Sequence, residues 1–276
     1  MLPGREIGKE IRWRRLFHTA DGRLLTLAVD HGAAYKFDLP DGLRDIARTL
    51  RKFHTTLPDA IVAQVGLFSS DAMRSFAGRV PLMLQTISIT PSAPDDSYPV
   101  STVEDAVTLG ADAAAVAISV GGATQARSMS LVGEVVRRAR PLGMPVVAHV
   151  YPLGEAFHGA EYAPHAVSYC ARAGFEAGAD LVKVHYTGDP DSFARIVEET
   201  PIGLVAAGGP KLSSVRAVLE MARDVARSGA CGLTIGRNLW GDPHPAALLQ
   251  ALLAVFHEGA PVADGEKIYS SGVSKG

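Results

Sequence analysis

Short apolar runs alternate with longer amphipathic stretches along most of the chain. The runs are rich in Val, Ile, Leu and Ala and end in glycine or polar residues, which is typical of buried strands. Between them, apolar residues recur at three- and four-residue spacing, which is typical of helices with one buried face. The pattern predicts strands over residues 24–30, 60–68, 81–88, 113–120, 145–152, 181–189, 202–207 and 232–236.

The intervening stretches predict a helix after almost every strand. Helices are expected over 4–18, 41–53, 71–76, 102–109, 125–142, 163–177, 191–199, 213–228 and 245–257, with loops over 89–100 and 153–162. The tail from residue 261 is polar and is expected to be loose. Strands alternating with helices at about thirty residues per unit predict a parallel β/α architecture. The number of units predicts a closed (β/α)8 TIM barrel, forming one α/β domain over residues 1–276.

Composition narrows the class of protein. Hydrophobic residues make up 47% and charged residues 20%, as in ordinary globular proteins, and the net charge of −2 argues against a general electrostatic grip on nucleic acid or an anionic membrane. The cysteines, Cys170 and Cys231, form neither a disulfide framework nor a Cys-x-x-Cys metal site. Residues 1–15 lack the apolar core of a signal peptide, and no apolar run reaches the length of a membrane span. We therefore expect a cytoplasmic protein with no nucleic-acid or membrane partner.

The strand at 181–189 carries a lysine in the middle of an apolar run. Alternate side chains of a strand face opposite ways, so Val182 and Val184 are expected to face the helices and Lys183 the barrel lumen. Burial disfavours the charged form of an amine, and a neutral amine is a nucleophile that condenses with a ketone. The alternative interpretation is a lysine at a strand edge that extends to water.

The last two predicted strands end in glycine-rich loops. In a barrel the chemistry lies where strands end, and a phosphate is often bound after the last two. Gly208 and Gly209 follow one strand, and Gly236 and Arg237 follow the other. Glycines let the backbone N–H groups approach an anion, and an arginine adds a charged hydrogen bond. Turn glycines beside an arginine in a structural ion pair are the alternative.

Other polar residues end earlier strands. Asp30 ends the first strand, where its carboxylate can hold the lysine, relay its proton or accept a hydrogen bond from a substrate hydroxyl. Tyr151 ends the fifth; a phenol in a dry site can protonate a substrate, although buried tyrosines are more often core residues. Gln85, near the end of the third, is expected to bind substrate.

Histidines raise the alternative of a metal site. His149 and His185 share the inward parity of Tyr151 and Lys183, and His31 lies nearby, so three imidazoles meet at one barrel mouth. The first strand, however, lacks a His-x-His pair, and a metal does not need an inward lysine. We therefore expect no metal or other cofactor, and we assign His149 and His185 to substrate binding.

A set of motifs at these strand ends resembles a known family. It comprises Asp30-His31-Gly32, Val150-Tyr151-Pro152, Val182-Lys183, Tyr186-Thr187-Gly188-Asp189, Ala207-Gly208-Gly209-Pro210-Lys211 and Gly236-Arg237-Asn238. Together they resemble the archaeal-type class I fructose-bisphosphate aldolases, a DeoC/LacD-like group that includes 2-amino-3,7-dideoxy-D-threo-hept-6-ulosonate synthases and the autoinducer-2 phosphate thiolase. The similarity runs from about residue 22 to 258.

The resemblance implies roles for individual residues. Lys183 matches the Schiff-base lysine, Tyr151 the acid–base tyrosine and Asp30 the aspartate that assists carbon–carbon cleavage. Gly208, Gly209, Gly236 and Arg237 match the phosphate site. Family members form rings, such as pentamers or decamers, so the resemblance also implies a homo-oligomer.

The sequence departs from the family pattern at three places. The loop Ala33 to Pro40 is longer and lacks the usual glycine, His149 stands where sugar aldolases carry tryptophan and the synthases methionine, and Ala207 replaces a serine. These positions are expected to surround the non-phosphate half of the substrate. Tyr151 argues against the thiolase, which lacks it.

The expected function is therefore a Schiff-base aldolase that acts on a phosphorylated ketose, with dihydroxyacetone phosphate as the ketone half. A transaldol-type synthase that joins an amino-acid semialdehyde to a ketose-phosphate fragment is the alternative. A sugar-phosphate-binding barrel without catalysis and a metal-dependent hydrolase are less favoured.

Overall fold

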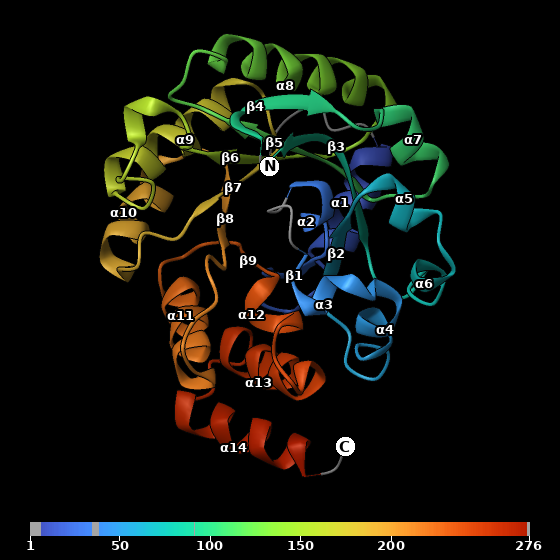
Figure 1. The fold of residues 1–276 in the computed structure, drawn as a ribbon, viewed down its shortest axis with the longest axis vertical. Helices are drawn as coiled ribbons and strands as arrows, with labels where there is room; N and C mark the ends of the chain where they lie inside the picture. Colours follow the sequence, from blue (N-terminus) through green and yellow to red (C-terminus); the bar gives the residue numbers. More distant parts are fainter. Residues whose placement is uncertain (1–6, 35–38, 91, 275–276) are drawn as a thin grey trace.

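A closed barrel of parallel strands organises the protein (Figure 1). The computed structural model describes residues 7–34, 39–90 and 92–274. Within these ranges each barrel strand pairs in parallel with its neighbours, and the last pairs with the first to close the ring. The barrel strands are β1 (Leu24–Ala28), β2 (Ala60–Ala63), β3 (Leu82–Thr90), β5 (Ala113–Ser119), β6 (Val146–Tyr151), β7 (Leu181–His185), β8 (Gly203–Ala207) and β9 (Gly232–Ile235). The predicted TIM barrel, in a single domain, is confirmed.

Helices surround the ring of strands, with α8 at the top of Figure 1 and α14 at the bottom. Helices α8, α9 and α11 place an apolar face on the strands, which is the arrangement that the helical spacing predicted. The helices are α1 (Ile7–Leu16), α2 (His31–Ala34), α3 (Asp41–Arg44), α4 (Ile46–Arg51), α5 (Val65–Phe68), α6 (Asp71–Arg74), α7 (Val103–Thr108), α8 (Gln125–Ala139), α9 (Pro164–Glu176), α10 (Pro190–Glu199), α11 (Val215–Arg227), α12 (Arg237–Trp240), α13 (Pro245–Phe256) and α14 (Val262–Val273). Short 3-10 turns cover Arg140–Leu142 and Glu155–Phe157.

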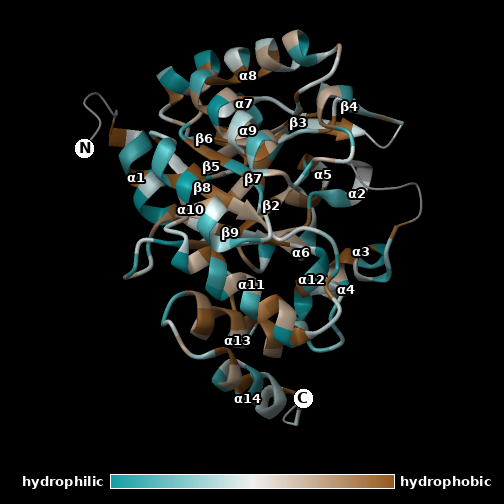
Figure 2. Cartoon of the chain, turned by 90° about the vertical axis from the view of Figure 1, so that its left-hand side faces the viewer, coloured by the Kyte–Doolittle hydropathy of each residue, from teal (hydrophilic) through white to brown (hydrophobic). Residues whose placement is uncertain are grey.

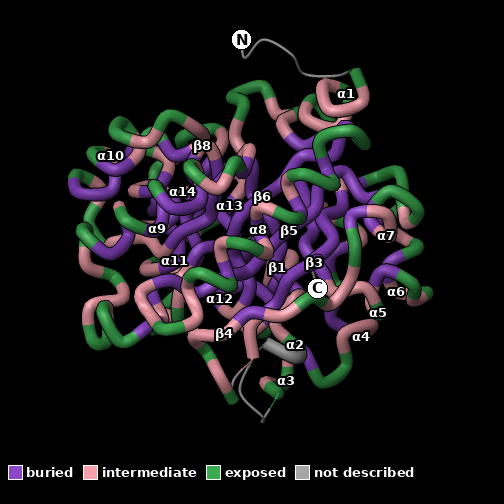
Figure 3. The backbone as a smooth tube through the Cα atoms, turned by 90° about the horizontal axis from the view of Figure 1, so that it is seen from above, coloured by how far each residue is buried: buried purple, intermediate pink, exposed green. Residues whose placement is uncertain are grey.

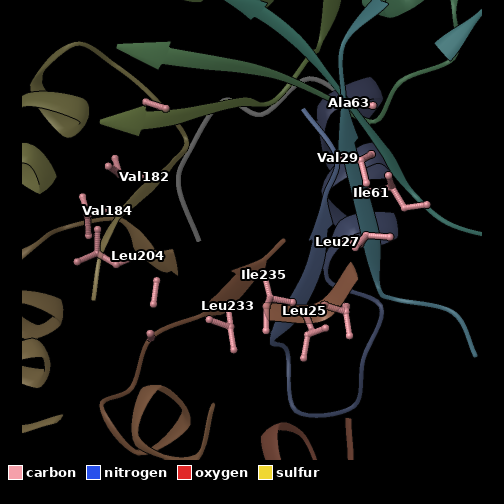
Figure 4. Packing of buried hydrophobic residues seen from close by; sticks show 14 of the residues in the cluster. Leu25, Leu27, Val29, Ile61, Ala63, Val182, Val184, Leu204, Leu233 and Ile235 are labelled. Atoms are coloured by element: carbon pink, nitrogen blue, oxygen red, sulfur yellow. The ribbon is translucent and has the colours of Figure 1, made fainter. Parts of the chain in front are cut away.

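The strands separate two apolar layers because successive side chains face opposite sides. Val182 and Val184 belong to the large layer between the strands and the helices, where Figure 4 shows them beside Leu204. Leu181 belongs to the smaller cluster inside the barrel. The predicted parity of this strand is therefore confirmed, and it places Lys183 in the lumen. Figure 3 shows the buried residues running through the strands, with exposed segments at the periphery.

The two ends of the barrel are built differently. Helix α1 lies at the end where the strands begin, and α2 and β4 lie at the opposite end (Figure 2). The N-terminal helix was predicted over 4–18; it runs from Ile7 to Leu16, and residues 4–6 lie outside the described range. Among the described residues, no helix is both long and apolar enough to cross a bilayer.

Two predicted boundaries in the first half were wrong. The strand expected over 60–68 ends at Ala63, because the chain turns at Gln64, whose carbonyl accepts hydrogen bonds from the N–H groups of Leu67 and Phe68 to begin α5. A continuous apolar run does not distinguish a buried strand from a short helix. The helix expected over 41–53 is broken at Asp45, which has non-helical dihedral angles and accepts a hydrogen bond from Arg48 N at the start of α4.

The predicted loop over 89–100 contains a strand, β4 (Ala93–Pro99), which pairs antiparallel with β3. Its proline and aspartate residues hide the strand signal, because both are unfavourable in most strands. They are tolerated here because β4 is an edge strand outside the ring, anchored by buried Ser97, whose hydroxyl lies 3.1 Å from that of Ser128.

The prediction of a loose tail from residue 261 was also wrong. Residues Val262–Val273 form α14, which packs on α13 and α11 and buries Val262 and Gly265. Apolar and small residues every three or four positions give this polar-looking segment one packable face.

Candidate active site

A cavity of about 230 Å³ opens at the end of the barrel where the strands finish. Its lining comes from seven of the eight barrel strands or the loops that follow them, which is why residues far apart in sequence meet there. The lining residues are Ala28, Asp30, His31, Gln85, Ser88, Ile89, Ala117, Tyr151, Leu153, Lys183, His185, Ala207, Gly208, Gly209, Thr234, Gly236 and Arg237. All but one of the predicted site residues are among them; the exception is His149.

Lys183 projects into this cavity from β7 and is only 5% exposed. Its neighbours in the register are His149 on β6 and Val205 on β8, so an imidazole and an aliphatic side chain flank it. Its Nζ lies 6.0 Å from the centre of the Tyr151 ring. An amine in this position is confined beside a phenol, with room in the cavity for a small carbonyl compound.

Tyr151 belongs to a stack of aromatic rings. Its ring centre lies 5.2 Å from that of His185, and on the other side the His185 ring stacks on Tyr162 at 4.5 Å with an interplanar angle of 13°. The Nδ1 atom of His185 lies 3.1 Å from the carbonyl oxygen of Glu161, which makes it the donor and fixes the ring orientation. The loop that carries Glu161 and Tyr162 therefore helps to hold Tyr151 in place.

Asp30 lies across the lumen between two imidazoles. Its Oδ1 atom is 3.3 Å from His31 Nδ1, and its Oδ2 atom is 3.9 Å from His149 Nδ1. His149 is 2% exposed and is not among the residues that line the cavity, so its direct contact with substrate stays a prediction.

These histidines are held in the neutral form. Burial lowers the pKa of His149 well below its ordinary value, and the charges of Lys183 and His31 lower it further. Burial also lowers the pKa of His31, against the attraction of Asp30, and the pKa of His185. Neutral imidazoles add no positive charge around a lysine that must itself become neutral to act as a nucleophile.

Gln85 is buried, and one polar atom of its side chain has no hydrogen-bond partner among the described residues. Its Nε2 atom donates a hydrogen bond to the carbonyl of Ile87, which orients the amide, while Oε1 has no hydrogen-bond partner. A buried acceptor at a cavity wall without a partner is a place where a ligand hydroxyl can donate.

The predicted phosphate loops face each other beside Arg237. Gly209 has a φ of 64°, the left-handed conformation that favours glycine, so the loop after β8 turns sharply there. A Cβ atom on Gly236 would lie 2.7 Å from His31 Cε1 and 3.0 Å from the Ala28 carbonyl oxygen, so no larger residue fits. The cavity therefore has a backbone-lined corner with an arginine at its edge.

Asn238, which the sequence analysis did not assign to the site, holds this corner together. Its Nδ2 atom donates to the carbonyls of Gly208 and Pro210, both at 2.8 Å, and its Oδ1 atom accepts from Leu212 N at 2.7 Å. Trp240, two residues on, donates to the Ala28 carbonyl at 3.0 Å. The only sequence signal for Asn238 was its place in the Gly236-Arg237-Asn238 motif.

The altered loop after Asp30 is described only in part, since residues 35–38 lie outside the described residues. Within the described chain, no group of three His, Cys, Asp or Glu residues is arranged to hold a metal ion. The described site is an amine, a phenol and a carboxylate in one cavity, with a backbone-lined corner beside an arginine.

Comparisons with known proteins place the chain in a family. The sequence model of the DeoC/LacD family aldolases matches residues 24–242. A 2-amino-3,7-dideoxy-D-threo-hept-6-ulosonate synthase of Halobacterium salinarum is 34% identical over 92% of this chain and 94% of that protein. A class 1 fructose-bisphosphate aldolase of the same species is 31% identical over 88% and 93%.

The structural comparison agrees. A Schiff-base-forming fructose-1,6-bisphosphate aldolase, solved with reaction intermediates, superposes with a TM-score of 0.81 at 29% identity, over 90% of this chain and 99% of that one. The family that the strand-end motifs resemble is confirmed. The chain therefore belongs to the DeoC/LacD family of aldolases and is a class I aldolase, a lyase that forms a Schiff base through a lysine.

Proposed function

We propose that the protein cleaves and forms a carbon–carbon bond in a phosphorylated ketose, with dihydroxyacetone phosphate as the ketone half. The observation that carries the proposal is the buried Lys183 in a cavity that also holds Tyr151, Asp30 and the glycine loops beside Arg237. These groups supply a nucleophile, an acid, a base and a phosphate anchor. The family membership accounts for the chemistry, and the residue roles below are our assignment.

The first step joins Lys183 to the substrate. The neutral amine attacks the ketone carbon, and loss of water leaves an iminium ion bonded to Nζ. The phosphate of the substrate lies against the Gly208–Gly209 and Gly236 backbone, with Arg237 on its charge. That anchor and Lys183 fix the ketone half at both ends.

The second step breaks the carbon–carbon bond. Asp30 takes the proton of the hydroxyl next to the bond, the aldehyde forms, and the bonding electrons move into the iminium to give an enamine. The carboxylate lines the cavity together with Lys183, where this hydroxyl would lie.

The third step returns the enzyme to its starting state. Tyr151 gives its proton to the enamine carbon, and water then hydrolyses the iminium and releases dihydroxyacetone phosphate. Proton exchange with water restores Tyr151 and Asp30. The stack with His185 and Tyr162 keeps the phenol beside Lys183.

A second candidate is a transaldol-type synthase that joins an amino-acid semialdehyde to a ketose-phosphate fragment. The similarity to the synthase of Halobacterium salinarum, at 34% identity, supports this second candidate. The similarity to the aldolase, at 31%, supports the first candidate to the same degree. Both candidates share the first two steps. In the synthase the enamine carbon then attacks the semialdehyde instead of taking a proton from Tyr151, and water releases the joined product from Lys183. Assembly as a homo-oligomeric ring and a cytoplasmic location stay predictions; light scattering and cell fractionation test them.

Trapping with borohydride tests the proposal. Reduction in the presence of dihydroxyacetone phosphate is expected to fix a mass adduct on the peptide that carries Lys183. Lys211, exposed and hydrogen-bonded to the Gly241 carbonyl at 2.9 Å, is the matched control, and Lys211→Ala should trap normally. An adduct on Lys211, or turnover without any adduct, would contradict the assignment. A screen of sugar-phosphate aldehydes and amino-acid semialdehydes, measured by mass spectrometry, separates the two candidates.

A further inference from the structure

We propose that His149 is a positioning residue, whose Nδ1–H group orients the Asp30 carboxylate toward the substrate hydroxyl that loses its proton. The inference deepens the proposed function and rests on it, because it assumes Asp30 as the base of bond cleavage. It assigns a role to a side chain that lies behind the lining of the cavity.

The first observation is an unsatisfied atom. His149 is almost completely buried, and its Nδ1 atom has no hydrogen-bond partner among the described residues. A buried polar group without a partner costs free energy, so a functional reason is expected. Within the described part of the chain, the carboxylate in ion-pair contact with this atom is that of Asp30, with Oδ2 at 3.9 Å.

The second observation concerns which nitrogen of His149 carries the proton. An ionised carboxylate only accepts hydrogen bonds, so an imidazole nitrogen that faces it is favoured as the donor. The distance of 3.9 Å is too long for a hydrogen bond, so the proposed bond requires the carboxylate and the ring to approach each other. Catalytic hydrogen bonds are often long before substrate is bound.

The third observation is that a different histidine ring lies near each oxygen of the Asp30 carboxylate. His31 Nδ1 lies 3.3 Å from Oδ1, on the side of β1 and α2, and His149 Nδ1 lies nearer Oδ2, on the side of β6. The two rings flank the carboxylate, and a hydrogen bond from His149 Nδ1 to Oδ2 would restrict its orientation. Restricting a base to a reactive orientation is a recognised source of rate enhancement.

The charges around His149 favour a neutral donor. Asp30 and His31 face it from the first strand and the helix that follows, and Lys183 is its register neighbour on β7. Burial, Lys183 and His31 together lower the pKa of His149, so the ring stays uncharged near neutral pH. A neutral ring donates a hydrogen bond to a carboxylate without the positive charge that would weaken the carboxylate as a base.

Nuclear magnetic resonance tests the contact without any turnover. In protein labelled with ¹⁵N-histidine, the His149 signals, identified by their loss in His149→Asn, are expected to show the neutral Nδ1–H tautomer near neutral pH. Asp30→Asn should shift them. The inference would be overturned if His149 were the Nε2–H tautomer, or if its signals were the same in Asp30→Asn as in the wild type. Either result counts whether or not the protein proves to be the proposed aldolase.

Kinetics test the role through two half-reactions. His149→Leu removes the donor at similar volume and is expected to lower carbon–carbon cleavage by about 10², as loss of one oriented donor does. Exchange of the dihydroxyacetone phosphate proton needs Lys183 and Tyr151 only, so its rate should stay within about threefold. His149→Asn keeps a donor at the δ position and should restore cleavage to within about tenfold of the wild type.

The outcomes are distinguishable. Equal loss of cleavage and exchange in His149→Leu would indicate general damage to the site, and no loss of cleavage would indicate a packing residue; either overturns the inference. Failure of the wild-type protein to trap dihydroxyacetone phosphate on Lys183 would instead refute the proposed function. His257→Asn, at the other end of the barrel, is the matched histidine control and should leave both half-reactions unchanged.

Discussion

His149 and His257 lie at opposite ends of the same barrel and are treated in opposite ways. At the end where strands begin, His257 has a carboxylate on each nitrogen, with Nδ1 3.0 Å from Asp21 Oδ2 and Nε2 2.9 Å from Asp59 Oδ2. Burial acts to lower the pKa of His257, but the hydrogen bonds and charges of Asp59 and Asp21 outweigh it and raise the pKa. At the other end, burial and Lys183 lower the pKa of His149, and its Nδ1 atom has no hydrogen bond.

The difference is that the polar groups around His257 stabilise the fold, whereas those around His149 lie at the candidate active site. Asp59 also accepts a hydrogen bond from Leu25 N at 2.6 Å, so the His257 cluster ties the end of α13 to the starts of β1 and β2 with its polar atoms satisfied. The cavity end leaves His149 Nδ1 and Gln85 Oε1 unsatisfied. Unsatisfied groups cost stability, and barrels concentrate such groups where the strands end, since that is where substrates bind.

The largest expected effect is that of Lys183→Met. It removes the nucleophile, so turnover should fall by about 10⁴ or more. It also replaces a buried amine by an apolar side chain of similar length, so the melting temperature should stay equal or rise. Steady-state assays and thermal unfolding on one preparation measure both. A variant that loses stability along with activity would contradict the view that Lys183 serves catalysis at a cost to stability.

Tyr151→Phe is expected to have the next largest effect. The hydroxyl that protonates the enamine is lost, so turnover should fall by about 10² to 10⁴, the usual contribution of a positioned acid. The ring remains and the stack with His185 is kept, so folding and borohydride trapping should survive. Wild-type exchange of the dihydroxyacetone phosphate proton in this variant would show that Tyr151 is only a wall of the cavity.

Arg237→Ala should weaken substrate binding by about 2 kcal/mol, in line with the loss of a charged hydrogen bond. The Michaelis constant is the measurement, with phosphate as a competitive inhibitor. Lys211→Ala removes a neighbouring cation that is not among the residues lining the cavity, so its Michaelis constant should match the wild type. An Arg237→Ala enzyme with an unchanged constant would identify a structural arginine.

The sequence predicted the parts of this comparison that follow from periodicity. Strand parity placed Lys183 in the lumen and Val182 outside, because alternation is a local property of the chain. The glycine loops after β8 and β9 could be predicted because glycine marks positions where the backbone turns sharply or approaches another group closely, and that is visible in the sequence itself.

The rest depends on contacts between distant segments. Strand β4 exists because β3 offers it an edge, and α14 because α13 and α11 offer it a surface. His149 shares the parity of Tyr151, but it is not among the residues that line the cavity, and its Nδ1 atom lies 3.9 Å from Asp30, more than a hundred residues earlier in the chain. No local pattern shows which of two inward residues reaches the cavity.

The smallest expected effect is that of His257→Asn, which should lower the free energy of unfolding by about 1 kcal/mol, since solvent at the barrel floor weakens the ion pairs. The effect should depend on pH with a definite sign. The pKa of His257 is higher in the folded protein than in the unfolded chain, so its contribution is complete below about pH 6.5 and declines as the pH rises through the folded-state pKa. Urea unfolding of the wild type and of His257→Asn, below about pH 6.5 and again above the folded-state pKa, should therefore show a larger difference in unfolding free energy at the lower pH. The two proteins should have the same turnover. A difference that grows toward alkaline pH would mean that the two carboxylates do not hold this histidine charged.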